Sequence, residues 1–155
     1  MNRSSVWWLS VGRGLALLTL VGGGLVVHAG PQTATDCRAA EPVPWQAVAP
    51  GVWVWLPPGA GDVSPANAGH VVPTSVVLGG RDAMVIDPGP SHRHGLRLRQ
   101  SIACRFKASV RWIVNTHAHS ENVLANSAFA DLAANGRVDI LATARQRRQN
   151  PCVHG

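Results

Sequence analysis

Hydrophobic and polar residues follow two different periods along this chain. In the stretch GVWVWLP, residues 51–57, valine and leucine lie on one side and Trp53 and Trp55 on the other. This alternation predicts a strand with apolar residues on both faces, as expected where a sheet is covered on both sides. The two tryptophans are therefore expected to lie in the core or in the wall of a cleft, and we prefer the core.

A hairpin and two later strands are predicted from the same kind of pattern. The β-branched stretch 70–78 is interrupted by Pro73, so its strand should begin after that proline. The residues GGRD would form the turn, and residues 83–87 the return strand. Two more apolar stretches predict a buried strand and a short one, at 109–115 and 137–143.

Helices are predicted between and after the later strands. Leu98, Ile102 and Phe106 recur every four residues and would form an inward apolar stripe. Ser91 could serve as the N-cap of this helix, which covers residues 96–106. Two further stretches read as helical, 120–134 and the start of a helix at 144–149. A hairpin followed by alternating strands and helices indicates an α/β layered domain.

The N-terminal residues read as a targeting segment. Arg3 and Arg13 precede a short apolar stretch, and no acid accompanies them. Small residues at Val27 and Ala29 then lead into the rest of the chain. This order is typical of a secretory signal peptide, so residues 1–29 are expected to be removed and the protein to be periplasmic or secreted. An uncleaved segment would instead anchor the protein at the membrane.

Composition divides the remainder into three parts. Residues 30–47 are rich in Pro, Ala and Thr and are expected to form a linker, and 48–142 to form the domain. Residues 143–155 are expected to form a basic, poorly ordered tail. The formal net charge is +6, but the basic residues are not interleaved with aromatic ones, so no nucleic-acid partner is expected.

The three cysteines allow one disulfide and leave one thiol over. They are Cys37, Cys104 and Cys152, and an exported protein meets an oxidising compartment. We prefer the pair Cys37–Cys104 because Cys152 lies in the expected tail. Spacing alone does not decide the connectivity, and none of the three has the C-x-x-C spacing of a structural zinc site.

The candidate chemistry lies in IVNTHAHSENVLAN, residues 113–126. His117 and His119 are two residues apart after a predicted buried strand, so in an extended segment they project to the same side. Imidazole is a common zinc ligand, and two such nitrogens supply half of a tetrahedral shell. A second H-x-H pair, His92 and His94, enters a helix, where such positions diverge. We interpret that pair as a cap and a surface residue.

The context of these histidines resembles the N-terminal half of a metallo-beta-lactamase superfamily hydrolase. The resemblance covers roughly residues 48–142 and includes the hairpin that ends in Asp87-Pro88-Gly89, the following helix, and the strand that runs into NTHAHSEN. It implies half of an αββα sandwich, preceded here by a signal peptide. Within the superfamily, we expect the chain to resemble the zinc metallohydrolases associated with quinoprotein (PQQ-dependent) systems.

The resemblance also assigns roles to residues. The motif of the superfamily is H-x-H-x-D-H, and His117 and His119 match its first pair, which binds one zinc. Glu121 stands where the aspartate belongs and Asn122 where the last histidine belongs. A glutamate can still bind metal or act as a base, whereas an amide is a poor zinc ligand, so the second zinc site should be damaged. Asp87 matches a residue that braces the metal loop.

Two functions follow as expectations. The first is an exported zinc-dependent hydrolase in which zinc-activated water attacks an ester, thioester or lactam bond of an unknown small-molecule substrate, with Glu121 as ligand or base. The third histidine of the family is missing, although Cys152 and His154 could in principle complete the shell. The second is a non-catalytic truncated relic or binding module with a weak metal site. A truncated half would also expose a sheet edge and could self-associate through it.

Overall fold

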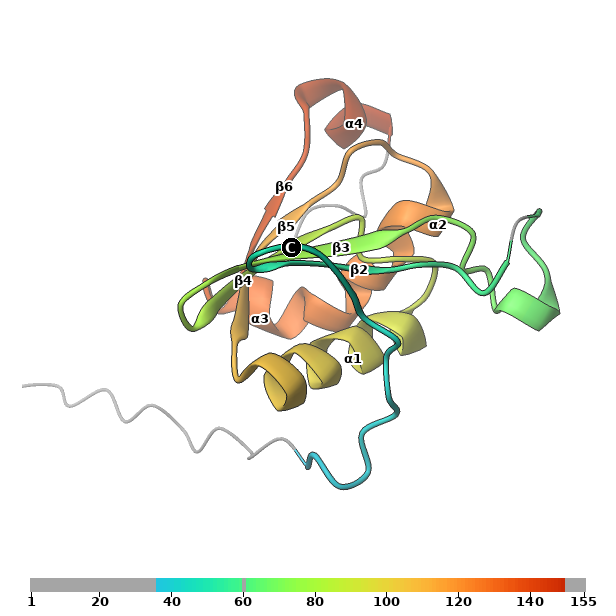
Figure 1. Cartoon of the computed structure of the whole chain (residues 1–155). Coiled ribbons are helices and arrows are strands. Elements are labelled where there is room, and N and C mark those ends of the chain that lie inside the picture. The colour runs from blue at the N-terminus through green and yellow to red at the C-terminus, as the bar shows by residue number, and fades with distance from the viewer. Residues whose placement is uncertain (1–35, 60, 150–155) are drawn as a thin grey trace, which may run out of the picture. The chain divides into compact units, whose positions relative to one another are not determined.

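A single six-stranded sheet organises the part of the chain that the structure, a computed structural model, describes: residues 36–59 and 61–149. The strands are ordered as in the sequence, so neighbours in the chain are neighbours in the sheet (Figure 1). The first four form an antiparallel meander, and β5 and β6 add in parallel. The strands are β1 (Gln46–Ala49), β2 (Val52–Trp55), β3 (Thr74–Gly79), β4 (Asp82–Ile86), β5 (Ser109–Val114) and β6 (Asp139–Leu141).

Helical segments connect the parallel strands and cover one face of the sheet. Figure 1 shows α1 and α3 side by side on the same side of it. Because β4, β5 and β6 run parallel, each connection must cross back over a face, and helices supply that crossing. The segments are η1 (Pro65–Asn67), α1 (His92–Ser101), a π-helical turn η2 (Ile102–Phe106), α2 (Ser120–Val123), η3 (Leu124–Phe129), α3 (Ala130–Ala134) and α4 (Ala144–Gln149).

The predicted strands are confirmed, and the helix predicted at 96–106 is present as α1, which begins earlier, at His92, followed by the π-helical turn η2. Strand β3 begins at Thr74, directly after Pro73, and Ser91 caps α1 by accepting a hydrogen bond from the backbone N–H of His94 at 3.2 Å. Leu98 and Ile102 are fully buried against the sheet. The predicted stripe therefore faces inward, and it joins the core of Trp45, Trp55, Val76, Ala83, Val85, Val110, Ile113 and Phe129.

The opposite face of the sheet, which we call the open face, also carries apolar side chains. Strand register places Val54, Ser75, Ile86, Val114 and Leu141 side by side in one row across five strands. A second row consists of Val52, Val77, Met84, Trp112 and Asp139. The prediction of apolar residues on both faces of β2 therefore extends to most of the sheet.

The prediction of a linker at residues 30–47 is wrong for its last residues, from Val43 onward. Strand β1 begins at Gln46, and Val43 and Trp45 are buried in the core. The indole N–H of Trp45 donates to the hydroxyl of Ser101 on α1 at 2.9 Å, which satisfies the polar atom of a buried ring. This anchor makes the segment from residue 43 part of the domain.

The predicted helix at 120–134 is divided into α2, η3 and α3. The backbone N–H of Ala125 donates to the carbonyl of Gly89 at 3.0 Å instead of to a carbonyl of its own helix. Ala125 belongs to the 3₁₀ segment η3, which packs closely against α1 at Gly95. A Cβ at Gly95 would lie 2.6 Å from the carbonyl oxygen of Ala125. Docking onto α1 and the 87–90 loop thus overrides the local preference for one continuous helix.

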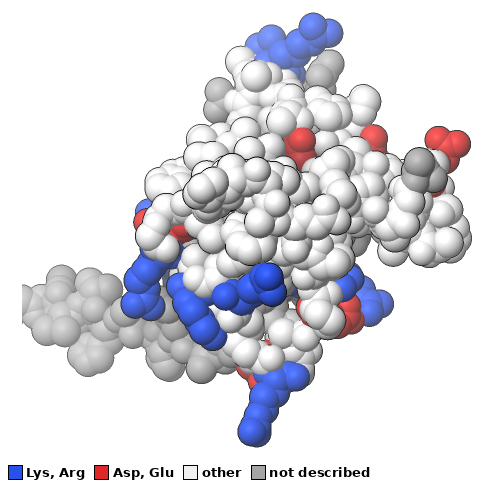
Figure 2. All heavy atoms as spheres, viewed as in Figure 1, with Lys and Arg blue, Asp and Glu red and all other residues white. Residues whose placement is uncertain are grey.

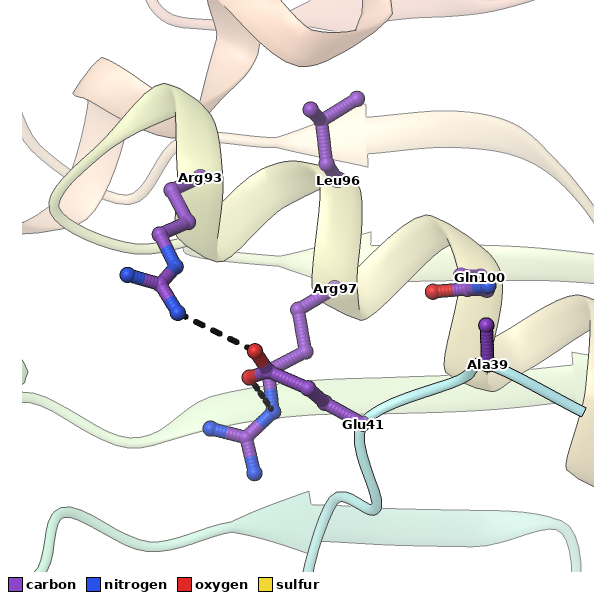
Figure 3. Close-up of a pocket in the computed structure, with 6 residues that line it drawn as sticks. All are labelled: Ala39, Glu41, Arg93, Leu96, Arg97 and Gln100. Atoms are coloured by element: carbon purple, nitrogen blue, oxygen red, sulfur yellow. Dashed lines mark hydrogen bonds and ion pairs between the residues drawn. The ribbon is translucent and has the colours of Figure 1, made fainter.

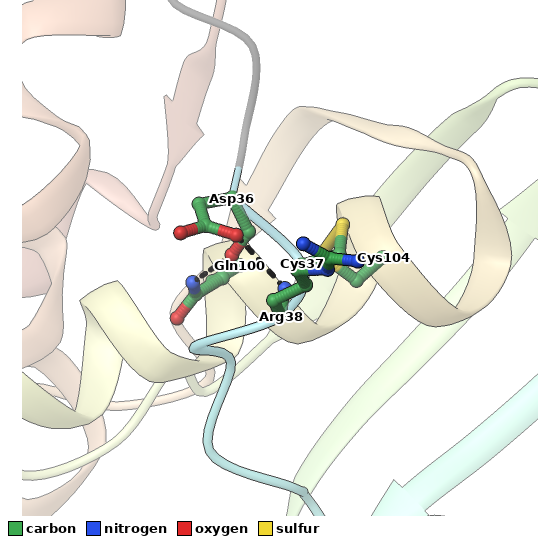
Figure 4. Close-up of a disulfide and its surroundings, with 5 residues drawn as sticks. All are labelled: Asp36, Cys37, Arg38, Gln100 and Cys104. Atoms are coloured by element: carbon green, nitrogen blue, oxygen red, sulfur yellow. Dashed lines mark hydrogen bonds between the residues drawn. A yellow bond between two sulfur atoms is a disulfide. The ribbon is translucent and has the colours of Figure 1, made fainter.

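A disulfide fastens the N-terminal segment to the helical layer. Cys37 pairs with Cys104, as preferred from the sequence (Figure 4). Beside it, the side-chain amide of Gln100 donates to the carbonyl of Asp36 at 2.7 Å. Cys152 lies outside the described residues, so its state stays open.

The predictions for the two ends of the chain have different outcomes. The expected tail is partly helical, and the expected signal peptide is not covered by the structure. Residues 144–149 of the expected tail form helix α4, and buried Gln146 donates from its amide to the carbonyl of Asn115 at 3.1 Å. The predicted signal peptide, 1–29, lies outside the described residues. Among the helices that are described, none has the length and hydrophobicity to span a bilayer. Figure 2 shows arginine and lysine side chains in separate places, over α4 and around α1, rather than in one stripe.

Candidate metal centre

The candidate site forms where β4 and β5 end together. These strands are parallel neighbours, so the residues that follow them meet at one edge of the sheet, which is where α/β sheets place their ligands. The backbone N–H of Asp87 donates to the carbonyl of Val114 at 2.9 Å and extends the ladder by one residue. The segment 115–119 is thereby held against the 87–90 loop.

Asp87 braces the histidine loop, as the resemblance implied. Its carboxylate accepts the backbone N–H of Thr116 at 2.8 Å and the hydroxyl of Thr116 at 2.6 Å. Its own carbonyl accepts the hydroxyl of Thr74 at 2.9 Å. Asp87 is buried and has a left-handed backbone, with φ of 51°, a conformation that costs free energy and needs such supporting contacts.

Thr116 passes this support on to His117. Its oxygen lies 2.8 Å from Nδ1 of His117. Because the hydroxyl hydrogen is donated to Asp87, the oxygen is free to accept, and this favours the tautomer of His117 with a proton on Nδ1. The lone pair of Nε2 is then available, which is the arrangement that outer partners give to a metal-binding histidine.

The two predicted histidine ligands lie together. The ring centroids of His117 and His119 are 4.8 Å apart, with planes at 74°. Two imidazoles bound to one zinc through nitrogens at about 2.0 Å, with a tetrahedral angle, have ring centres about 5 Å apart. The separation therefore fits a shared ion, and the side chain of His119 is 70% exposed and open to one.

Glu121 lies beside His119 at the start of α2. One carboxylate oxygen is 3.5 Å from Nδ1 of His119, and the other accepts the hydroxyl of Ser120 at 3.2 Å. The pKa of this carboxyl is lowered, mainly by a hydrogen bond from its own backbone N–H. Burial opposes this effect, and the hydroxyl of Ser120 and the charges of His119 and His117 lower the pKa further. Glu121 is thus an ionised carboxylate beside His119, placed to act as a charge, a ligand or a proton acceptor.

The shell is incomplete within the described residues. Asn122, the position of the family's last histidine, is fully buried, and its side-chain oxygen has no hydrogen-bond partner. Over residues 36–59 and 61–149, no group of three or more His, Cys, Asp or Glu residues is arranged to hold a metal ion. The described residues therefore supply two imidazoles and no complete shell. Cys152 and His154, the other predicted candidates, lie outside the described residues.

A second histidine pair, which the sequence did not single out, lies under β2. The ring of His94 stacks on Trp55 at 4.1 Å between centroids, and His70 meets the ring of His94 at 4.7 Å. Nε2 of each histidine is buried and has no partner. The prediction that His94 is a surface residue is therefore wrong, because the side chain turns toward Trp55, whereas His92 is exposed as predicted.

A shallow hollow of about 180 Å³ lies on the outer side of α1 (Figure 3). In Figure 3, Glu41 reaches between two arginines: its carboxylate is 3.1 Å from Nη2 of Arg93 and 3.4 Å from Nε of Arg97. Both arginines of this hollow are paired with its one acid, and none of the predicted site residues lines it. We therefore place no chemistry there.

The chain resembles known proteins in structure, although comparisons of its sequence find no match. No protein-family model and no curated protein sequence matches the chain. A metallo-beta-lactamase from Hirschia baltica aligns with a TM-score of 0.56 and 20% identity, covering 70% of this chain and 47% of that one. The metallo-beta-lactamase FIM-1 from Pseudomonas aeruginosa, in its mono-zinc form, aligns at 0.56 and 21%, covering 73% and 47%. A metallo-beta-lactamase from Erythrobacter litoralis aligns at 0.53 and 18%, covering 70% and 45%.

These likenesses concern the fold. The chain spans about half the length of the solved structures that it matches. The predicted resemblance to the superfamily is confirmed at this level, while the quinoprotein-associated branch stays a prediction. The described chain has part of the metallo-beta-lactamase fold, with one six-stranded sheet and the histidine pair at the end of β5.

Proposed function

We propose that this protein is an exported, zinc-dependent hydrolase of the metallo-beta-lactamase type. The observation that carries the proposal is the braced pair of imidazoles, His117 and His119, whose 4.8 Å separation fits one shared ion. When bound, zinc would supply an activated water for attack on an ester, thioester or lactam carbonyl of a small molecule. The mono-zinc state of one similar solved structure makes a single-ion site a reasonable form for this chain as well.

The residues of this chain would divide the remaining work. His117 would bind through Nε2, because Thr116 occupies its Nδ1, and Asp87 holds Thr116 in place. Glu121 would contribute negative charge next to His119, as a ligand or as the group that receives a proton from water. Its lowered pKa keeps it ionised at neutral pH, which both roles require.

One observation favours a second function, a non-catalytic module with a weak metal site. Two imidazoles alone form half of a tetrahedral shell, and Asn122 is buried rather than turned to the site. A metal held by so few groups would bind weakly and would lack the rigid surroundings that hydrolysis needs. The two functions differ in zinc affinity and in turnover, so they can be separated by measurement.

The first test is zinc content and affinity of the full chain, by metal analysis and titration calorimetry. The hydrolase requires about one zinc per chain, bound at micromolar affinity or tighter, and its loss in His117→Ala and His119→Ala. His92→Ala is the matched control, because this histidine is exposed on α1. Binding that is absent, or that survives equally in all variants, would contradict the metal site and with it both functions.

The brace offers a second test that does not depend on turnover. Thr116→Val removes the hydroxyl between Asp87 and His117, so zinc affinity should fall by roughly 10- to 100-fold, the usual effect of losing an outer partner. Thr116→Ser keeps a hydroxyl at the same place and should restore most of the affinity. Equal zinc affinity in the valine variant would refute the role of this contact.

Catalysis is tested on the zinc-loaded protein with chromogenic ester, thioester and lactam substrates. Glu121→Gln keeps the size of the side chain and removes its charge and basicity. The hydrolase predicts that turnover falls by at least tenfold while most of the zinc stays bound. Weak zinc binding without turnover in the unaltered protein would favour the non-catalytic module.

A further inference from the structure

Gly89, in the loop after β4, attaches that loop to the segment that follows the histidines. Its backbone N–H donates to the carbonyl of Asn122 at 3.1 Å, and its carbonyl accepts the N–H of Ala125 at 3.0 Å. The N–H of Asn122 in turn donates to the carbonyl of His119 at 3.0 Å and closes the turn that contains Glu121. The position of Gly89 therefore fixes a turn that carries one predicted ligand and the acid beside it.

The imidazole of His94 lies directly behind Gly89. A Cβ built on Gly89 would lie 2.5 Å from Cδ2 and 2.7 Å from Nε2 of His94, so the loop and the ring leave no space for a side chain between them. The face of the same ring stacks on Trp55, with 4.1 Å between centroids and 9° between planes. His94 thus connects a buried residue of β2 to the backbone of Gly89 by direct contact.

Neighbouring rings hold the imidazole in this place. Trp55 is itself buried and packs edge-on against Trp45, with 6.3 Å between ring centroids. The ring of His70, also buried, meets the ring of His94 at 4.7 Å and 60°. The imidazole is therefore supported by rings from β2 and from the loop between β2 and β3, whereas His92, two residues earlier, is exposed.

A histidine at this position needs a physical reason. Nε2 of His94 is buried and has no hydrogen-bond partner among the described residues, and a buried polar atom without a partner costs free energy. An aliphatic side chain would avoid that cost. Imidazole, however, is the smallest aromatic ring among the side chains, so it can stack on Trp55 and still leave room for the backbone of Gly89. The shape of the ring, rather than a hydrogen bond, explains its presence.

We propose that His94 is a positioning residue of the metal centre, which supports Gly89 from behind and thereby fixes the turn that begins at His119. The inference rests on the proposed function, because it takes His119 as a zinc ligand. Asp87 supports His117 separately, through the hydroxyl of Thr116. Loss of the imidazole should therefore loosen the second half of the histidine segment and leave the first half in place.

The first measurement is hydrogen exchange of single backbone amides in the metal-free full chain, followed by NMR. In His94→Ala, the amides of Gly89 and Ala125 should exchange faster by roughly tenfold or more, because the bonds between the loop and the turn open more often. The amide of Ser109, which donates to the carbonyl of Arg81 at the opposite end of β5, should be unchanged.

The second measurement is zinc affinity by titration calorimetry. His94→Ala should lower it by roughly 10-fold, the lower end of the effect of losing an outer partner. His94→Gln should restore most of the affinity and most of the amide protection, because its planar amide extends about as far from the backbone as Nε2 of the imidazole. His92→Ala is the matched control on the same helix turn and should change neither quantity, since that side chain is exposed.

The two measurements separate this inference from the proposed function. If zinc binds but exchange at Gly89 and Ala125 is unchanged in His94→Ala, the inference fails and the hydrolase stands. Exchange that rises equally at Ser109 would mean a general loss of stability, and local loosening with unaltered zinc affinity would mean that the turn positions no ligand; either result overturns the role of His94. If the unaltered protein binds no zinc, the proposed function fails, and exchange alone decides whether the imidazole supports the turn.

Discussion

The half-buried ring of His94 under β2 leads to a quantitative prediction about acid stability. His94 stacks on Trp55, faces His70 and leaves Nε2 buried without a partner. The pKa of His94 is lowered from 6.5 to about 3. Burial is the main cause, and the charges of His70 and Arg97 add to it. The folded protein therefore keeps this imidazole neutral at pH values at which the unfolded chain takes up a proton.

The sign and size of the effect follow from linkage. Above pH 6.5 the side chain is neutral in both states and contributes no pH dependence. As the pH falls below 6.5, the unfolded state binds a proton that the folded state refuses, so the free energy of unfolding decreases by about 1.4 kcal/mol per pH unit until the folded pKa near 3. At pH 5 the loss from His94 is about 2 kcal/mol. His70 acts in the same direction, because burial lowers its pKa as well.

The assay is urea unfolding of the full chain at pH 7, 6 and 5, followed by tryptophan fluorescence. His94→Phe keeps an aromatic ring on Trp55 and removes the titration, so its loss of stability between pH 7 and 5 should be smaller than that of the unaltered protein by about 2 kcal/mol. His94→Gln serves as a second variant, since the ring edge lies against Gly89 and leaves little room for a larger ring. His92→Phe, two residues away and exposed, should keep the original pH dependence.

The carboxyl of Glu121 contributes little to the change in stability between pH 7 and 5. The pKa of this carboxyl is lowered from 4.5, so its contribution to stability is lost mainly as the pH falls below that value. If both His94 variants retain the full loss of stability between pH 7 and 5, the imidazole is not held neutral by its burial, and the reasoning fails.

Two further predictions concern the attachment of elements to each other. Gly95→Ala should lower the free energy of unfolding by about 1–3 kcal/mol, because the new methyl would lie 2.6 Å from the carbonyl oxygen of Ala125, whereas Gly79→Ala meets no atom within 4 Å and is the control for chemical denaturation. Replacing Cys37 and Cys104 together by serine should cost about 2–4 kcal/mol, since the bond closes a loop with a sequence separation of 67. The same loss should appear when the unaltered protein is reduced, and stability indifferent to reductant would contradict the pairing.

Several elements were predictable because a local pattern decided them. Alternation located β2, the β3–β4 hairpin and β5, and the four-residue recurrence of Leu98 and Ile102 located the inward stripe of the first helix. Proline at 73 and serine at 91 marked a strand start and a cap through backbone geometry that does not depend on distant residues. In these places propensity, pattern and tertiary packing all favour the same structure.

Other elements depend on partners that lie far away in the sequence. Strand β1 lies in a proline-rich stretch, and its entry into the domain depends on Trp45 finding the hydroxyl of Ser101, 56 residues later. The break in the predicted helix at 120–134 depends on the carbonyl of Gly89. The divergence of His92 and His94 follows from helical spacing, but the burial of His94 requires Trp55 and His70, which no local pattern connects to it.

The candidate site shows the same division within a few residues. The family resemblance implied that Asp87 braces the histidine loop, and the structure makes that contact through bonds from Thr116 to Asp87, where the parallel neighbours β4 and β5 end. The tautomer of His117, by contrast, depends on which way one hydroxyl points, and no spacing encodes that direction. Strand order therefore predicts that a site forms at this edge, whereas side chains at hydrogen-bonding distance determine whether it can hold a metal. The decisive variant is therefore Thr116→Val, which removes the side-chain contact to His117 and leaves the order of the strands unchanged.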